Sequence, residues 1–395
     1  MKRRLSSFPR WSVIRPFLIG GVVLTVCSLK TTAQSPSSST LDRTTGPSCT
    51  LDRATGTTID PEPFLRNAWG SRWNLATNRI AYVQPNAQGY YRIFTISPDG
   101  SNRKALTEGQ PEFPPNKHQG MLYWHPSGRY LLFAAQKPEW TGRTLFGAPD
   151  YEALPGFGLH NDLWLMTADG SRCWQLLHEP NTEQQGILMP VFSPDGRRVA
   201  WSSRQPGKKH ELKYVLKVAD FVETPEPHLE NIKSYEPGGL TYYETGSFTS
   251  DSQNLAYTSD QDTHSFLRSQ IYLLHLASGI GTRLTTGNDY NEHPIVVNTP
   301  GGDWIVYMST KGVDRFPFKL ALGTDWYAMR TDGSEVKRLT TMNVNRKDNP
   351  ENAGYRQVAC TVAISPSGEF MLGDVQDNLA RQTGMIRIVH FVGHP

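Results

Sequence analysis

Histidine and carboxylate side chains are the residues of this sequence whose types could do chemistry. Imidazole and carboxylate groups together suit Zn, Mn or Fe. The histidines that fall in or beside predicted loops are His118, His160, His178, His210, His264 and His293. Acidic residues in the same kind of segment are Asp260, Asp262, Asp289 and Glu292. Three or four of these side chains could therefore converge on one divalent metal or serve as an acid–base site.

The spacing of these residues argues against a built metal site. The sequence has no H-x-H, no H-E-x-x-H and no C-x-x-C, the close spacings that indicate ligands on one element. We therefore predict no metal and no cofactor, and interpret most of the histidines as surface residues of loops. The alternative is one divalent metal held by His118, His293 and His264.

Motifs of other activities are absent from the sequence. There is no G-x-S-x-G, so no nucleophile elbow of a hydrolase is indicated. No Walker A loop and no G-x-G-x-x-G opening a helix are present, and nucleotide binding has no support. The sequence thus favours a protein that is not an enzyme.

A repeated strand–turn–strand unit must position any site. Its clearest copy is 192–201, FSPDGRRVAW, and similar units begin at Trp73, Trp124, Phe248, Val297 and Ile364. The turn glycines and their equivalents fall at 78, 128, 196, 252, 302 and 368. A second hairpin follows most copies, with Asp-Gly or Ser-Gly at turns that need positive φ. Six units of four short strands predict an all-β fold, a six-bladed β-propeller of four-stranded antiparallel blades.

The repeat resembles the PD40 (WD40-like) repeat of the TolB-like propellers. FSPDGRRVAW at 192–201 and DWYAMRTDGSEVKRLT at 325–340 carry the resemblance, which covers about residues 66–391. It implies the fold rather than a function, and the chain has no room for the N-terminal domain of TolB. Prolyl-oligopeptidase-type propellers and oligogalacturonate lyases are similar too, but no motif specific to either is found.

Propeller topology predicts which face carries a site. The turns within the two hairpins of each repeat are tight and lie on one face of the propeller. The loops that join the hairpins lie on the other face and are long, and long loops carry binding residues. The residues that we expect on this binding face are His118, His160, His264, His293, Asp260, Glu292, Tyr290 and Arg356. His118 and His293 are expected immediately before inner strands, facing the channel. Phe157 and Tyr242 are among the aromatic residues of the same loops.

The N-terminal segment has the features of an export signal. Residues 1–33 hold six basic residues and no acid, with an apolar run from Phe17 to Leu29 that is short for a membrane span. We predict a signal peptide at 1–33 cleaved after Ala33, a disordered Ser/Thr/Pro-rich linker at 34–60 and a propeller at 61–395. Lipidation of Cys27 is the alternative to cleavage. Thr57–Ile59, or nearby residues before Trp73, could supply the last strand of the ring.

Two functions follow from these observations. The first is an exported, periplasmic or extracellular, non-catalytic propeller that binds a protein or glycan through its long-loop face. The second is a metal-dependent lyase or hydrolase with a histidine-based site at the mouth of the channel. Without its signal the chain has 34 basic and 37 acidic residues, so nucleic acid is not an expected partner. We expect a monomer that meets a membrane only if Cys27 is lipidated.

Overall fold

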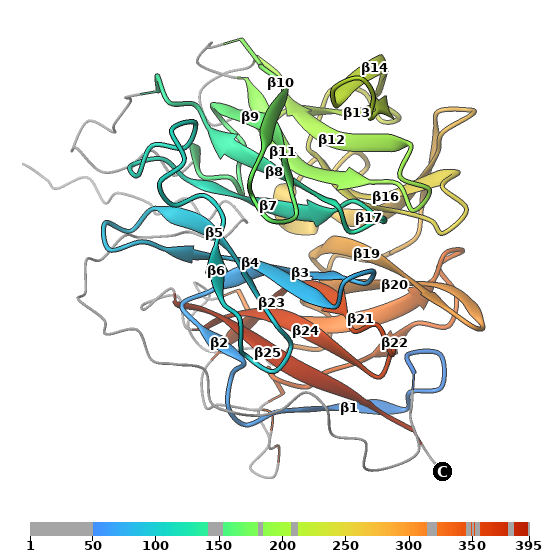
Figure 1. Cartoon of the computed structure of the whole chain (residues 1–395). Helices are drawn as coiled ribbons and strands as arrows, with labels where there is room; N and C mark the ends of the chain where they lie inside the picture. Colours follow the sequence, from blue (N-terminus) through green and yellow to red (C-terminus); the bar gives the residue numbers. More distant parts are fainter. Residues whose placement is uncertain are drawn as a thin grey trace, which may run out of the picture.

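Six antiparallel sheets form the blades of a propeller (Figure 1); five have four strands, and the sixth has four strands and an additional short one, β2. The structure is a computed structural model and describes residues 50–140, 153–180, 185–206, 212–313, 322–344, 349, 351, 356–377 and 383–393. The expected signal peptide, Cys27, Ala33 and most of the expected linker lie outside this range. Within it, no helix is long and apolar enough to cross a membrane.

The strands of each blade are named A to D from the channel outward. Blade 1 comprises β3 (Trp69–Asn74), β4 (Arg79–Pro85), β5 (Tyr91–Ile96) and β6 (Lys104–Ala105). Blade 2 comprises β7 (Gln119–Trp124), β8 (Tyr130–Gln136), β9 (Asn161–Thr167) and β10 (Cys173–Leu177). Blade 3 comprises β11 (Gly186–Phe192), β12 (Arg198–Arg204), β13 (Tyr214–Val222) and β14 (His228–Tyr235).

The second half of the ring repeats this order. Blade 4 comprises β15 (Tyr243–Phe248), β16 (Asn254–Ser259), β17 (Gln270–His275) and β18 (Ile280–Arg283), with a 3₁₀ turn η2 at Phe266–Arg268. Blade 5 comprises β19 (Asn291–Thr299), β20 (Gly302–Ser309), β21 (Asp325–Arg330) and β22 (Lys337–Arg338). Blade 6 comprises β23 (Gln357–Ile364), β24 (Phe370–Asp377) and β25 (Thr383–Val392), and its D strand is β1 (Gly56–Ile59).

The tight A–B turns confirm the repeat that the sequence predicts. Positions 78, 128, 196, 252, 302 and 368 all have positive φ, including Asn78 at 52° and Ser252 at 60°. This region of φ is reached most easily by glycine and next by small polar residues. The predicted turn residues are therefore equivalent in all six blades.

The ring is closed by a strand from the N-terminal side of the chain. β1 pairs antiparallel with β25, with Gly56 opposite Val392 and Ile59 opposite Val389, and β2 (Leu65–Arg66) pairs with the other end of β25. Figure 1 shows β1, in blue, alongside β25, in red. The predicted closure from Thr57–Ile59 is confirmed. Residues 50–60, which low complexity suggested as linker, belong to the ring, because the side chains of Leu51 and Ala54 are buried against blades 5 and 6.

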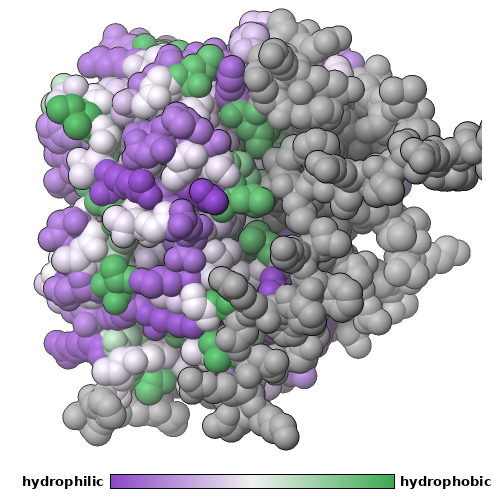
Figure 2. All heavy atoms as spheres, turned by 180° about the vertical axis from the view of Figure 1, so that it is seen from behind, coloured by the Kyte–Doolittle hydropathy of each residue, from purple (hydrophilic) through white to green (hydrophobic). Residues whose placement is uncertain are grey.

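The core lies between neighbouring blades rather than inside any one sheet. Each cluster of buried apolar residues combines strands of two adjacent blades, as where Val83 and Ile93 of blade 1 meet Leu122 and Phe133 of blade 2. The exposed large apolar residues are scattered. Figure 2, which views the molecule from behind, shows isolated hydrophobic residues among hydrophilic ones over the described part of the face that it presents. Burial between blades therefore holds the ring around its channel.

Gly373 of blade 6 makes room for a large side chain of blade 5. Tyr82, Phe133, Trp201, Tyr257 and Tyr307 occupy one position of the B strand in blades 1 to 5, and blade 6 has Gly373 there. The ring of Trp326, from the C strand of blade 5, fills this space, and its Nε1 donates to the carbonyl of Cys360 at 2.8 Å. A methyl group at position 373 would overlap that ring.

We expect Gly373→Ala to lower the free energy of unfolding by about 1–3 kcal/mol, the usual cost of overpacking. Urea denaturation of the purified protein measures this loss. Gly56→Ala is the matched control, because a methyl group there meets no atom within 4 Å. Equal unfolding free energies of the two variants would show that the Trp326 ring can move aside without loss of stability.

Candidate functional site: a pocket in the central channel

A pocket opens into the channel at the end where the A strands begin and the B–C loops lie. Its cavity measures about 80 Å³, several times the roughly 10–15 Å³ that one water needs. Leu154, Gly156 and Phe157 of one predicted long loop line it, with Leu212 of another. The pocket therefore lies on the face that the sequence predicts as the binding face.

A bulge in each A strand determines which side chains enter the channel. The antiparallel register shifts between Trp69 and Arg72 in β3, and at the corresponding place in every other A strand. Such a bulge adds an unpaired residue and re-aims its side chain. Met121, Met189 and His293 have positive φ here, between 48° and 56°. The residues at this position of blades 1 to 6 are Gly70, Met121, Met189, Thr245, His293 and Thr361.

The channel consequently has a polar half and an apolar half. Blades 4 and 5 place Glu244 and Glu292 just before the bulge, in equivalent positions, and His293 follows Glu292. Blades 2 and 3 contribute Met121, Leu122, Leu188 and Met189 to the opposite wall of the pocket. A ligand in the channel would therefore meet charged groups on one side and flexible apolar groups on the other.

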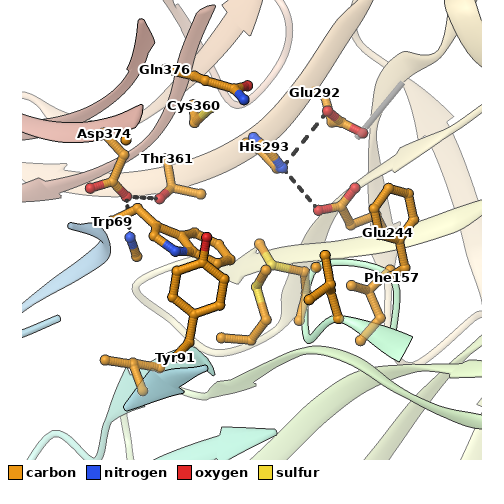
Figure 3. A pocket seen from close by; sticks show the side chains of 18 of the residues that line it. Trp69, Tyr91, Phe157, Glu244, Glu292, His293, Cys360, Thr361, Asp374 and Gln376 are labelled. Carbon is orange, nitrogen blue, oxygen red and sulfur yellow. Dashed lines mark hydrogen bonds and ion pairs between the residues drawn. The ribbon is translucent and has the colours of Figure 1, made fainter. Parts of the chain in front are cut away.

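The side chains of the polar half touch one another (Figure 3). His293 Nε2 lies 3.1 Å from Glu244 Oε1 and 3.7 Å from Glu292 Oε2. The hydroxyl of Tyr242 contacts both carboxyl groups, at 3.0 Å from Glu292 Oε1 and in a short hydrogen bond with Glu244. Both glutamates are buried. The cluster thus holds two carboxyl groups against one imidazole.

Burial and mutual charge set the protonation of this cluster. Burial and then the charge of Glu244 raise the pKa of Glu292 to about 8. Burial alone would lower the pKa of His293, but the charges of Glu244 and Glu292 raise it to about 9. Burial opposes ionisation of Glu244 too, yet the charge and hydrogen bond of His293 lower its pKa overall. At neutral pH the cluster is therefore an imidazolium, the Glu244 carboxylate and the neutral acid of Glu292.

A third buried acid in the channel, Asp374, is structural. Asp374 accepts hydrogen bonds from the Ser71 hydroxyl at 2.9 Å, the Thr361 hydroxyl at 2.6 Å and the Gly70 amide at 3.0 Å. Burial raises its pKa, although Thr361 and the charge of Arg72 oppose that rise. Because β24 of blade 6 carries Asp374 and β3 of blade 1 carries Gly70 and Ser71, this acid joins the two blades.

Two buried polar atoms beside the cluster are open to a ligand. His293 Nδ1 and Gln376 Nε2 are buried and have no hydrogen-bond partner among the described residues. Both residues line the pocket, and Figure 3 places Gln376 on the same side of the channel as Cys360 and His293. A buried donor without a partner is costly, so these atoms favour a bound water or ligand group.

Of the residues predicted from the sequence, His293 and Glu292 lie in the pocket. Tyr290 packs beside them, close enough that burial and then the charge of Glu292 raise the pKa of its hydroxyl. Asp260, just after β16, is turned to the segment before β15, where it accepts from the Thr241 hydroxyl at 2.5 Å. Arg356 precedes β23 and is half-buried. The pocket thus brings together only some of the residues that we expect on the binding face.

His118, His160 and His264 lie elsewhere, and His210 is outside the described residues. His118 is buried against the rings of Tyr90 and Tyr91, accepts from the Tyr91 amide at 3.2 Å, and has its pKa lowered to about 3, first by burial. His160 stacks on Trp140, with ring centroids 3.5 Å apart, and burial is the main cause that lowers its pKa to about 4. His264 is exposed in the turn after Asp260.

The expected metal set of His118, His293 and His264 needs correction. Among the described residues, the group of possible ligands within 4.8 Å of one another is Glu244, Glu292 and His293. The expectation that both His118 and His293 immediately precede inner strands is wrong for His293, which lies at the bulge inside β19. His118 precedes β7, at the position that Tyr242 and Tyr290 occupy in blades 4 and 5.

Glu244 is the functional candidate that sequence reasoning missed. The signal was present in the repeat, because Tyr242-Tyr-Glu244 and Tyr290-Asn-Glu292 stand the same number of residues before Phe248 and Val296. Adjacent blades place equivalent A-strand positions side by side around the channel. Aligning the copies from the turn back to the start of each A strand would have paired the two glutamates.

Comparison with known proteins supports the fold. No model of a known protein family matches the chain. A tricorn protease homologue of Streptomyces coelicolor is 27% identical over 177 residues, which is 41% of this chain and 15% of that protein. This chain thus spans a small part of the curated relative that it matches.

Solved structures of low sequence identity share the architecture. TolB from Acinetobacter baumannii is 15% identical with a TM-score of 0.50, over 79% of this chain and 64% of that one, slightly under two thirds. An oligogalacturonate lyase from Vibrio parahaemolyticus is 12% identical with a TM-score of 0.49, over 82% and 78% of the two chains. The six sheets and the likeness to TolB from Acinetobacter baumannii show that this chain has the six-bladed β-propeller fold of the TolB-like proteins.

Proposed function

We propose that this chain is an exported binding propeller that takes a peptide segment of a protein partner into its channel from the long-loop face. The observation that carries the proposal is the division of one pocket into a charged half on blades 4 and 5 and an apolar half on blades 2 and 3. Peptides combine apolar side chains with backbone polar groups, which is the pattern that such a pocket matches.

The apolar half favours a peptide over a sugar. Methionine is unbranched and flexible, so Met121 and Met189 can adapt to side chains of different shapes. Leu154, Phe157 and Leu188 complete that wall with groups that form no hydrogen bonds. A glycan would leave many hydroxyl groups without partners there, at a cost for each.

The polar half offers donors for peptide carbonyl groups. The imidazolium of His293 presents Nδ1–H, and Gln376 presents Nε2, both without a partner among the residues described. Glu244 can accept from a peptide amide. Fixed polar groups of this kind give orientation, while the apolar wall gives affinity.

Export rests on the N-terminal segment of the sequence. Its basic residues and short apolar run have the order of a secretory signal, and the TolB-like propellers that the repeat resembles include periplasmic envelope proteins. A partner in the periplasm or outside the cell fits this origin. The proposal is tested with the purified ring, which needs no assumption about the route of export.

The proposal predicts that the pocket selects peptides. A phage library of random peptides and a glycan microarray are the two probes, applied to the wild-type protein and to Met121→Glu, which places a charge on the apolar wall. Leu75→Glu is the matched control, because Leu75 is 65% exposed in an A–B turn on the opposite face. We expect peptides to be enriched, and the affinity of a selected peptide to fall at least about tenfold in Met121→Glu only.

Three results would contradict the peptide proposal. These are enrichment of glycans alone, no enrichment in either screen, and equal affinity of Met121→Glu and wild-type protein. Melting temperatures of all variants check that the ring is intact. Met121→Ala, which removes contacts without adding charge, replaces Met121→Glu if the latter does not fold.

A further inference from the structure

We infer that Glu244, Glu292 and His293 form a binding site for one divalent transition-metal ion in the channel. This inference goes beyond the peptide proposal, because it needs only the polar half of the pocket, where Glu244 would bind the ion instead of a peptide amide. Figure 3 shows the three side chains converging from neighbouring blades on one point of the channel wall.

The spacing of the donor atoms suits one ion. Metal–ligand distances of about 2.0–2.2 Å for His nitrogen and carboxylate oxygen place two ligands of a tetrahedral ion about 3.3–3.6 Å apart. His293 Nε2 lies 3.1 Å and 3.7 Å from the nearest oxygens of Glu244 and Glu292. All three donors are within 4.8 Å of one another. Side-chain rotations alone would therefore bring them to coordination distance.

The chemistry of the donors selects the class of metal. One imidazole and two carboxylates suit Zn, Mn and Fe, whereas sites for Ca or Mg are built from oxygen alone. Three protein ligands leave a position for water or a ligand group, as in open zinc sites. The same pocket is lined by the buried amide of Gln376, only 6% exposed, whose Nε2 has no partner among the described residues.

The surroundings support the carboxylates as ligands. The hydroxyl of Tyr242 contacts both carboxyl groups, and such outer partners orient metal-binding carboxylates. Glu244 and Glu292 are 4% and 2% exposed, and two buried carboxyl groups need positive charge nearby to remain ionised. Arg72 is directed to Ser71 and Thr361, beside Asp374. Within the described chain, His293 is the cation in contact with the pair, and a bound divalent ion would bring positive charge to both carboxylates.

Cobalt binding tests the site directly. We expect the EDTA-treated protein to bind one Co²⁺ with visible absorption bands typical of nitrogen and oxygen ligands, and one Zn²⁺ to displace it in calorimetry. Glu244→Gln and Glu292→Gln preserve side-chain shape and should each weaken binding about 100-fold or more. Glu230→Gln is the control, since Glu230 forms an exposed ion pair of similar composition with His228 at 3.0 Å in blade 3.

Two outcomes would overturn the inference: no stoichiometric binding by the wild-type protein, or undiminished binding by Glu244→Gln and Glu292→Gln. Melting temperatures without metal verify that each variant is folded, and an increase on adding Zn²⁺ should occur only where the site is complete. The peptide screens repeated in EDTA separate the two proposals. Peptide enrichment without metal would leave the binding function standing even if the metal site failed.

Discussion

Glu292→Gln is expected to stabilise the metal-free protein at pH 8 and to leave its stability nearly unchanged at pH 5. Burial and the neighbouring Glu244 raise the pKa of Glu292 from 4.5 to about 8 in the folded state. The folded protein therefore binds a proton that the unfolded chain has released. This raised pKa means that stability is fully present below pH 4.5 and is lost as the pH rises through 8.

Glutamine reproduces the neutral acid at every pH, so the variant avoids that loss. At about 1.4 kcal/mol for each pH unit, the interval from 4.5 to 8 sets an upper bound of about 5 kcal/mol. We expect a gain of about 3 kcal/mol at pH 8, because Glu292 is coupled to Glu244 and His293. Urea denaturation from pH 5 to 9 in EDTA gives the profile.

His293 should give the wild-type profile a second contribution of the same sign. Its pKa is raised from 6.5 to about 9 by the two glutamates, against the effect of burial, so its stabilisation is present below pH 6.5 and is lost through pH 9. Glu244→Gln is the comparison variant, because it removes a carboxylate that His293 needs. A flat wild-type profile, or a Glu292→Gln variant less stable at pH 8, would contradict this account of the cluster.

A chain beginning at residue 61 should lose the closing strand and with it a large part of its stability. β1 covers the edge of β25, and the preceding turn buries Leu51 at 1% exposure. Lys337 donates to the carbonyls of Leu51 and Ala54, and Thr57 donates to the carbonyl of Leu339. We expect a loss of about 3–6 kcal/mol from the buried surface and these hydrogen bonds.

The matched control is a chain beginning at residue 50, which keeps the turn and β1. Its unfolding free energy should equal that of the longer protein, whereas the chain from residue 61 should also associate through the uncovered edge of β25. Urea denaturation and light scattering measure the two effects. Equal stability of the two shortened chains would mean that β1 is not needed to close the ring.

The architecture was predictable from the sequence because its signals are local. A Pro-Asp-Gly turn and the aromatic residue before it indicate the structure of a few neighbouring residues. The number of times that they recur gives the number of blades. The closing strand was harder, since Gly56–Ile59 is short and follows a low-complexity stretch. Only the missing D strand of blade 6 indicated its role.

The candidate site was predicted in part because convergence depends on the bulges. The sequence identifies Glu292 and His293 as candidates in a loop-face segment, but does not show that a bulge turns His293 into the channel. It also suggests His118 as a partner, although packing between Tyr90 and Tyr91 holds that ring in place. Glu244 was not predicted, because a single acid in a strand shows no motif of its own. It becomes a candidate only when the copies of the repeat are aligned and it pairs with Glu292.

The closure of blade 6 determines when the ring can form during synthesis. β1 is among the first described segments to be made, and its partner β25 is the last strand of the structure. Five complete blades can therefore exist while the ring is still an open arc. A chain that leaves the ribosome N-terminus first cannot close the ring until Val392 has been made. Ring closure is thus a late step, which can occur only after the last strand of the propeller has been made.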